Sequence, residues 1–301
     1  MKKMIFLFMC LFIISGNLYA GGVIGVEKVD TSPTATANIG KIFIKRGIEE
    51  YGDDYKLMIH SDTENGDNNF IDSIQLHQIE AYGDMLHSAD EKKFGASSIQ
   101  FINGDYLSIS DSNDWDICGN NSDSCTIDFW FYHTGFEDVE CYVSQQEDKR
   151  NRWWLINRYG LGLVFRFKSN GKLMIDTDFG GSISNNKWHH MALIIKGNGS
   201  IKHIGVFLNG KQVTYASTSF IDRVEGDLCI GKIGDDGYAA FKGYIDEFRV
   251  INSNPFNASP NADKTDSITV PISEYTPTPG NLQLFYMDDE GNEYKVKLEK
   301  Q

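Results

Sequence analysis

The sequence predicts an all-β protein, built as a sandwich of two antiparallel sheets. Three features support this: many short apolar runs, Asn-Gly or Gly turns between them, and no sustained helical spacing of apolar residues. The clearest stretch spans residues 187–213, where a strand ends at Asn209-Gly210. This dipeptide favours a type I′ hairpin, because both central residues need a positive φ. Short strands joined by such turns are typical of a β sandwich.

The first 20 residues predict a secretory signal peptide. Lys2 and Lys3 precede an apolar run over residues 4–14, and Ala20 offers a small residue at the expected cleavage point. The run is too short to cross a bilayer comfortably, and an uncleaved N-terminal anchor is the alternative. We therefore expect a protein that is secreted or held at the cell surface or in the periplasm, with no membrane insertion after cleavage.

The chain of 301 residues carries a formal net charge of −14 at pH 7, and loss of Lys2 and Lys3 makes the mature chain more acidic still. Such a charge disfavours binding to nucleic acid and to anionic lipid, because like charges repel. It suits a soluble extracellular protein whose surface carboxylates can collect calcium.

Four cysteines follow the signal peptide, and an even number in an exported chain favours disulfide bonds. Cys118 and Cys125 flank a polar loop that a local bridge would pin. Cys141 and Cys229 lie in strand-like stretches and would pair across the fold. Free buried thiols are the alternative. The spacing matches no zinc pattern, since the sequence has no Cys-x-x-Cys.

Residues 21–53 predict an N-terminal linker or extension, with one short strand at 42–44. A dense aromatic run at 126–133 predicts a strand that is covered on both sides or lines a binding face. The other strands of the sandwich are expected at 55–60, 98–102, 106–109, 142–144, 153–157, 162–168, 172–176, within 187–215, at 228–231 and at 241–251.

The chain changes character at residue 253. Five of its six prolines lie within residues 253–280, among Asn, Ser and Thr, which predicts a linker that runs over the surface. Residues 281–301 predict a terminal hairpin with strands at 282–286 and 294–298. Because an isolated hairpin is marginal in water, this one should dock on the sandwich or on a partner chain.

Several stretches between residues 54 and 252, in this order and spacing, resemble the laminin G-like (LamG-like) jelly roll of the concanavalin A-like superfamily. They are Lys93–Ser98 with Phe101 and Gly104–Leu107, Thr126–Trp130, Trp188–His190, Leu208–Lys211, Ile230–Gly231 and Gly243–Val250. The resemblance implies two packed antiparallel sheets, the inner one concave. It implies no single activity, since this fold carries sugar binding, protein adhesion and glycoside hydrolysis. Similar proteins include surface or virion-associated adhesins.

The resemblance also implies a structural calcium, held between an acid at the end of an early strand and a late aspartate. The late residue is Asp246, which in regular alternation shares a face with Tyr244, Phe248 and Val250. The early candidates are Asp62, Asp67 and Asp72. Oxygen ligands from two distant loops would tie the chain ends together. The alternative is that Asp246 accepts backbone N–H bonds and the other acids are solvated.

The sequence predicts no enzymatic activity. Hydrolases on this fold need two carboxylates about 5 Å apart, and the resemblance implies that one strand carries them as Glu-x-Asp-x-Glu or a close variant. Glu137, Asp138 and Glu140 have the wrong spacing and are expected in a solvated turn. His189 and His190 should point to opposite faces of a strand, so they cannot bind one metal together.

Aromatic and polar residues in or near predicted loops are candidates for sugar binding, because rings stack on the apolar faces of sugars while polar groups bond the hydroxyls. Of the adjacent Trp153 and Trp154, one should be inside and one outside. The full set is Trp153, Trp154, Tyr159, Tyr238, Asp235 and Asp236.

Together these observations predict an exported, non-catalytic module that binds a glycan or another surface polymer, with a structural calcium. One alternative is a structural or adhesive component of a surface assembly or phage virion, with the terminal hairpin as its protein contact. A glycoside hydrolase of this fold is the third.

Overall fold

The computed structural model describes residues 41–45, 52–102, 104–117, 124–135, 138–199, 201–219, 222–234, 239–275, 283–287 and 293–296. The signal-peptide prediction lies outside these ranges. Among the described residues no helix is long and apolar enough to cross a membrane. The chain divides into two units, one of residues Tyr51–Thr276 and one of Met1–Glu50 with Pro277–Gln301.

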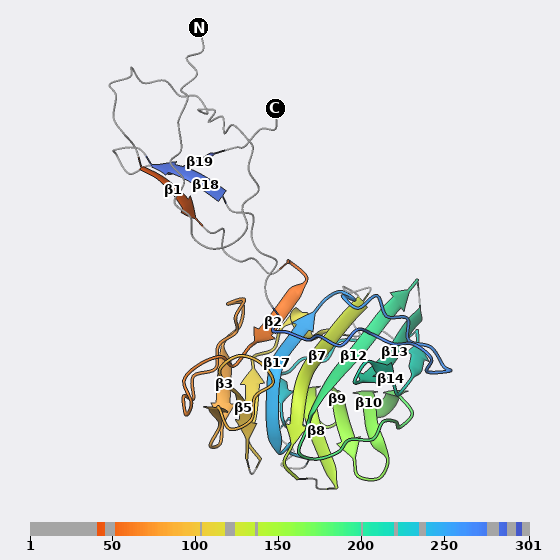
Figure 1. Ribbon diagram of the computed structural model, residues 1–301. Helices are drawn as coiled ribbons and strands as arrows, with labels where there is room; N and C mark the ends of the chain where they lie inside the picture. Colours follow the sequence, from red (N-terminus) through yellow and green to blue (C-terminus); the bar gives the residue numbers. More distant parts are fainter. Residues whose placement is uncertain are drawn as a thin grey trace. The chain divides into compact units, whose positions relative to one another are not determined.

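The larger unit is a jelly-roll sandwich of two antiparallel sheets, as the sequence predicts (Figure 1). The seven-stranded sheet has the order β11 (Lys172–Asp176), β10 (Gly162–Ser169), β9 (Arg152–Arg158), β8 (Val139–Gln146), β16 (Leu228–Ile230), β6 (Tyr106–Ile109) and β3 (Ile79–Tyr82).

The nine-stranded sheet has the order β14 (Lys211–Gln212), β13 (Ile201–Leu208), β12 (Trp188–Asn198), β7 (Ser124–His133), β17 (Gly243–Ile251), β5 (Ser98–Phe101) and β4 (Leu86–Ser88). Two further strands complete it, with β15 (Ala216–Thr218) beside β13 and β2 (Tyr55–Ile59) beside β17. A short 3₁₀ helix, η1 (Asn113–Trp115), follows β6.

The core lies between the two sheets and follows the two-residue period of the strands. Phe129 and Phe131 of β7 point into it, whereas Trp130 between them faces the outside of the nine-stranded sheet and is still only 6% exposed. Trp130 is therefore covered although it faces outward, whereas Tyr132, which follows on the same outer face, is only half-buried. His189 stacks on Phe131 in the interior and His190 contacts Trp130 outside, so their predicted opposite orientation is confirmed.

Tight Asn-Gly turns connect the strands where the sequence predicts them. Asn209 and Gly210 have φ values of 49° and 85° between β13 and β14. Asn170 and Gly171 have 50° and 81° between β10 and β11. Asparagine and glycine adopt this left-handed region at low cost, so both hairpins turn without strain.

A β-bulge interrupts β17 and changes which side chains face outward. The register against β7 shifts between Asp246 and Arg249, and Glu247 has a φ of 54°. The bulge inserts an extra residue into the alternation. Asp246 shares a face with Tyr244, as expected, but the expectation that it shares this face with Phe248 and Val250 is wrong. Phe248 and Val250 lie in the core, whereas Asp246 lies on the outer face of the sheet, opposite Trp130.

Residues 252–275, here called the strap, follow β17 and cross the nine-stranded sheet (Figure 1). The strap runs over the surface as the sequence predicts, but it also packs on the sheet. Its side chains Phe256, Ala258 and Ile268 form a cluster with residues of β12 and β13. The Ile268 N–H donates to the Gly210 carbonyl at 2.8 Å, which fixes the strap to the β13–β14 turn.

The smaller unit contains a three-stranded antiparallel sheet of β1 (Lys41–Lys45), β18 (Gln283–Met287) and β19 (Glu293–Val296). The terminal hairpin that the sequence predicts is β18 and β19. It pairs with β1 along the whole length of β18. A third strand therefore supports this hairpin, as its marginal stability in isolation requires.

The predicted disulfide between Cys141 and Cys229 is not formed in this structure. Strand register explains the difference, because Cys229 of β16 lies opposite Ser144 of β8 rather than opposite Cys141. Cys125 is buried, and Cys118 lies outside the described residues, so their predicted bridge stays a prediction.

Candidate functional site

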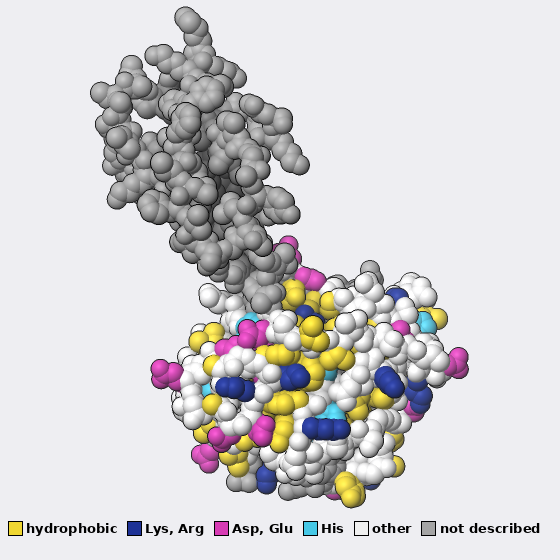
Figure 2. Space-filling view, viewed as in Figure 1, with side chains coloured by type: hydrophobic (Ala, Val, Ile, Leu, Met, Phe, Trp, Pro, Cys, Tyr) yellow, Lys and Arg dark blue, Asp and Glu magenta, His cyan; other side chains and the backbone are white. Residues whose placement is uncertain are grey.

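The outer face of the nine-stranded sheet carries a row of side chains that we call the aromatic row. Its members lie directly opposite one another on β12, β7, β17 and β5, and are Trp188, Tyr132, Tyr244 and Gln100. The ring centroid of Tyr132 is 5.6 Å from that of Trp188 and 5.9 Å from that of Tyr244. Figure 2 shows hydrophobic side chains gathered on this face, with charged side chains around them.

Hydrogen-bonding groups accompany the rings of the aromatic row. The amide of Gln100 donates to the Tyr244 hydroxyl at 3.0 Å. Burial and a hydrogen bond to Glu91 raise the pKa of the Tyr132 phenol, and burial raises that of Tyr244. Both hydroxyls therefore stay protonated. Trp188, Tyr132 and Gln100 are only half-buried, so the row offers rings and polar groups to a ligand.

A second row lies two residues away along β12, β7 and β17 and consists of His190, Trp130 and Asp246. The ammonium of Lys93 sits 3.9 Å from the ring centroid of Trp130, and Phe94 packs edge-on against it. These two residues belong to the loop between β4 and β5. The loop therefore borders the aromatic row and covers Trp130.

A third row consists of Asp128 of β7 and Arg249 of β17, which lie opposite each other. These buried residues form a charged network beneath the strap. The guanidinium of Arg249 donates from Nε to Asp128 Oδ1 at 2.6 Å and from Nη2 to Oδ2 at 3.3 Å. The Tyr275 hydroxyl also donates to Asp128 Oδ2, and its ring lies 3.6 Å from the guanidinium. His190 Nε2 completes the network, 3.2 Å from Asp128 Oδ2. Tyr275 thus anchors the end of the strap to the sheet.

A carboxylate of the second row is buried and only partly bonded. Asp246 Oδ2 accepts hydrogen bonds from the backbone N–H groups of Lys93 at 2.8 Å and Phe94 at 3.1 Å. Its Oδ1 has no hydrogen-bond partner within the part of the chain that the structure describes. Burial raises the pKa of this carboxyl to about 8, and the nearby charges of Glu247 and Asp62 add to the rise. The hydrogen bonds from the two N–H groups act in the opposite direction.

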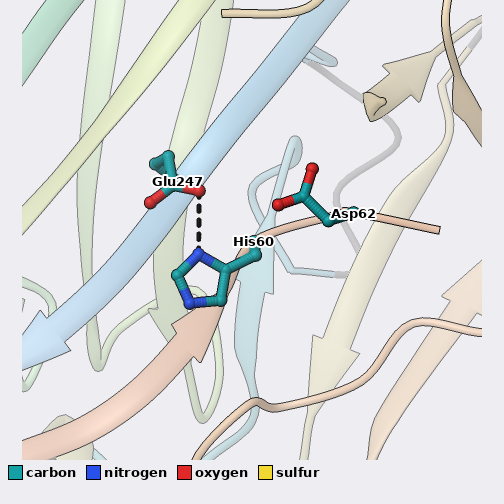
Figure 3. A group of neighbouring side chains, drawn as sticks. All are labelled: His60, Asp62 and Glu247. Atoms are coloured by element: carbon teal, nitrogen blue, oxygen red, sulfur yellow. Dashed lines mark hydrogen bonds and ion pairs between the residues drawn. The ribbon is translucent and has the colours of Figure 1, made fainter. Parts of the chain in front are cut away.

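Next to Asp246, three side chains from distant segments form the acid–histidine group: His60, Asp62 and Glu247 (Figure 3). Their potential ligand atoms lie within 4.8 Å of one another. His60 Nδ1 is 2.8 Å from Glu247 Oε1, and Glu247 Oε2 accepts from the Tyr275 N–H at 2.6 Å. Asp62 is exposed and accepts from the Ala96 N–H at 2.7 Å.

Burial and charge oppose each other in this group. Burial raises the pKa of the Glu247 carboxyl above its ordinary value, although the hydrogen bond from His60 works in the opposite direction. Burial alone would lower the pKa of His60, but the hydrogen bond to Glu247 and its charge raise it. A cation among these carboxylates would relieve their mutual repulsion.

The comparison with known families agrees with this architecture. A laminin G family model, described as the concanavalin A-like lectin/glucanases superfamily, matches residues 101–258. The chain belongs to this superfamily. The sequence matches no curated protein.

Solved structures that resemble this chain include domain 4 of AbnA, an extracellular arabinanase from Geobacillus stearothermophilus, in complex with arabinotriose. It is 17% identical, with a TM-score of 0.49 over 72% of this chain and 96% of that one. The binding domain of botulinum neurotoxin serotype D is 12% identical, with a TM-score of 0.46 over 81% and 73%. A carbohydrate-binding module of a Ruminococcus gnavus sialidase, bound to α2,3-sialyllactose, is 13% identical, with a TM-score of 0.35 over 49% and 89%.

The four aspartates predicted to bind calcium do not assemble into one set. Both oxygens of Asp72 are taken by backbone N–H groups, which are those of Met58, Ile74, Leu76 and His77. Asp67 accepts from the Asn69 N–H and the Thr63 hydroxyl. These bonds hold the pKa of the Asp67 carboxyl below its usual value. Asp72 and Asp67 therefore organise the turn after β2, and only Asp62 lies close to Asp246.

The structure adds two residues that the sequence reasoning missed, His60 and Glu247. Strand pairing brings them together, because Ile59 of β2 lies opposite Phe248 of β17. Calcium prefers an all-oxygen set of six to eight ligands. A group that includes an imidazole does not match this preference, so calcium binding remains a prediction from the family resemblance.

Two of the predicted sugar-binding residues are not accessible. Trp153 is 1% exposed in the core, where its Nε1 donates to Gln145 at 2.8 Å. Trp154 faces the opposite side as alternation requires, but it is 7% exposed and lies beneath the Arg152 guanidinium. Neither ring can stack on a ligand here. Tyr159 is 72% exposed in the turn between β9 and β10. Tyr238, Asp235 and Asp236 lie outside the described residues.

Glu140 also differs from its prediction as part of a solvated turn. It lies on β8, is fully buried, and its Oε2 is 2.9 Å from Nδ1 of the equally buried His133. His133 Nε2 in turn lies 2.8 Å from the Tyr142 hydroxyl. The strand begins at Val139, so Glu140 and Tyr142 share the face that points into the sandwich.

Proposed function

We propose that this chain is an exported, non-catalytic module that binds a neutral polysaccharide through the aromatic row. The observation that carries the proposal is the row itself. Trp188, Tyr132 and Tyr244 lie side by side on neighbouring strands, and Gln100 continues the line. Membership of the lectin-like superfamily and the predicted signal peptide support the same function.

The chemistry of the row fits a sugar chain. Ring faces pack on the C–H faces of pyranoses, and a few well-placed polar groups fix their orientation. Glu91 bonds Tyr132, and Lys93 lies over the neighbouring Trp130, so both charge signs occur at its margin. The whole chain is strongly acidic. This balance favours a neutral glycan over an anionic one, because an acidic protein repels anions.

The strap limits where a ligand can lie. It covers the third row, where Tyr275 and Phe256 pack over the Arg249 guanidinium. Along β7, Tyr132 of the aromatic row lies four residues from Asp128 of the third row. A glycan chain would therefore run across the strands, along the line of the row.

The arrangement of carboxylates supports binding without hydrolysis. The potential ligand atoms of Asp62 and Glu247 lie within 4.8 Å of each other, which is closer than the separation of about 5–5.5 Å between the two carboxylates of retaining glycosidases. Moreover, Glu247 is 1% exposed, and its oxygens are engaged by His60 and by the Tyr275 N–H. Release of reducing sugar from polysaccharides by the purified protein would favour the hydrolase alternative.

A glycan array probed with the mature chain tests the proposal, followed by calorimetric titration of the best neutral oligosaccharide. Trp188→Ala and Tyr132→Ala should each weaken binding by about tenfold or more, the usual cost of truncating an aromatic anchor. Tyr132→Phe keeps the ring and should lose much less. Tyr159→Ala is the matched control, because Tyr159 is exposed outside the row.

Equal affinity for the wild type and both row variants, with loss in Tyr159→Ala, would overturn the assignment of the site. No binding to any glycan would favour the alternative of an adhesive component of a surface assembly or virion. In that case, deletion of residues 277–301 should abolish assembly with the protein partner.

A further inference from the structure

We propose that His60, Asp62 and Glu247 bind a transition-metal ion of the zinc class, beside the buried carboxylate of Asp246. These residues hold one imidazole and two carboxylates within 4.8 Å (Figure 3). The proposal is separate from the sugar-binding function.

Strand pairing sets the position of the group. His60 directly follows β2, and Glu247 occupies the bulge of β17 next to the Ile59–Phe248 pair. The bulge takes Glu247 out of the regular alternation. Two of the three side chains are therefore placed by the ladder of the sheet, and Asp62 is placed by its bond to the Ala96 N–H.

An independent observation points to a cation here. Asp246 is fully buried, and its Oδ1 has no hydrogen-bond partner among the described residues. A buried carboxylate oxygen without a donor or cation is costly. The loop that holds Asp246 through the Lys93 and Phe94 N–H groups also holds Asp62 through Ala96. The unsatisfied oxygen thus belongs to the same loop assembly as the acid–histidine group, where a metal-bound water could donate to it.

The donor set favours zinc over calcium. Imidazole nitrogen and carboxylate oxygen both suit Zn²⁺, whereas Ca²⁺ takes oxygen ligands. Three protein ligands with a solvent molecule in the fourth position form an open tetrahedral site. The ligand atoms must move closer than their present spacing, and Asp62 can do so because its side chain is exposed. The ion would replace the hydrogen bond between His60 and Glu247.

Metal binding would also stabilise the strap. Glu247 bonds His60 through Oε1 and the Tyr275 N–H through Oε2. An ion on Oε1 would therefore tie the end of β2, the middle of β17 and the end of the strap together. Ligands that bind only the folded state raise its stability.

The test is calorimetric titration of the chelator-stripped mature chain with Zn²⁺, together with its melting temperature with and without the ion. The wild type should bind Zn²⁺ with micromolar or tighter affinity and melt at a higher temperature with it. His60→Gln should weaken binding at least about tenfold, since loss of even an outer partner of a metal ligand costs that much. Asp67→Asn is the matched control, an acid of the same turn outside the group, and should bind as the wild type does.

Asp62→Asn is the second variant in case His60→Gln does not fold, because Asp62 is exposed and an amide can still accept from Ala96. Binding of Co²⁺ gives a further readout, since a cobalt–thiolate absorption band would reveal binding at the cysteines instead. Unchanged Zn²⁺ affinity in Asp62→Asn, a thiolate band in the cobalt spectrum, or calcium displacing zinc at equal concentration would each overturn the proposal.

Discussion

Replacing Asp128 by alanine should lower the free energy of unfolding by about 3–5 kcal/mol, because it leaves a buried charge without its partner. Asp128 is 0% exposed, and Arg249, which bonds both of its oxygens, is 5% exposed. The variant leaves this guanidinium buried under the strap without its carboxylate partner. His190 and the Tyr275 hydroxyl lose the same acceptor.

Tyr275→Phe is the matched control. It keeps the ring over the guanidinium and removes only the hydroxyl that donates to Asp128. A hydrogen bond to a charged group contributes about 1.5–3 kcal/mol, so this variant should be less destabilised than Asp128→Ala. The double variant should cost less than the sum of the two, because both changes remove interactions at one carboxylate.

Urea unfolding followed by circular dichroism measures all three variants. A cost below about 1 kcal/mol for Asp128→Ala would refute the reasoning, since this is the range of solvent-exposed ion pairs. It would mean that water reaches the network and that the strap does not seal it.

Single contacts elsewhere give three more expectations. Burial raises the pKa of Asp116 to about 6 from 3.8, although nearby Arg223 opposes the rise. Because the folded state binds the Asp116 proton more tightly than the unfolded state does, ionisation of Asp116 destabilises the fold. This destabilisation is complete above about pH 6 and vanishes below about pH 4. Asp116→Asn should therefore stabilise the protein by about 1–2 kcal/mol at pH 8, a value that allows for solvent screening, and should have no such effect at pH 4. Urea unfolding at both pH values measures this, and a stability difference that does not change with pH would contradict the expectation. Gly95→Ala should cost about 1–2 kcal/mol in the same assay, because φ is +54° there and a Cβ would overlap the Asp62 carboxylate; unchanged stability would show that the loop relaxes. Alkylation of the unfolded, non-reduced protein should label Cys141 in peptide mass spectra, whereas a disulfide-linked pair of the Cys141 and Cys229 peptides would contradict the structure.

Much of the architecture could be predicted because its signals are local. Asn209-Gly210 forms its turn through its own backbone preferences, and the opposite orientations of His189 and His190 follow from the period of a strand. Trp153 and Trp154 also obey this period. Their accessibility could not be predicted, because it depends on what covers each face, such as the Arg152 guanidinium over Trp154.

The acid–histidine group was hidden by the bulge in β17. With regular alternation, Asp246 and Glu247 point to opposite faces of the sheet, and nothing in the sequence marks Glu247 as a residue with positive φ. Asp72 is the opposite case, because the sequence predicts it as a metal ligand and the structure gives it another role. An aspartate after a strand can bind a metal or accept the N–H groups of its own turn, and only the structure shows that Asp72 does the second.

The aromatic row required knowledge of strand register. Trp188, Tyr132 and Tyr244 are far apart in sequence and become neighbours only because β12, β7 and β17 pair as they do. Each lies in a strand that the sequence predicts, but a single chain does not reveal which residues face each other across strands.

A crystal structure of the mature chain with a bound neutral oligosaccharide tests the central claim most directly. Sugar rings should lie along the aromatic row, in contact with Trp188 and Tyr132 and hydrogen-bonded near Gln100. Sugar bound instead at the Tyr159 turn or on the seven-stranded sheet, with the row left in solvent, would contradict it.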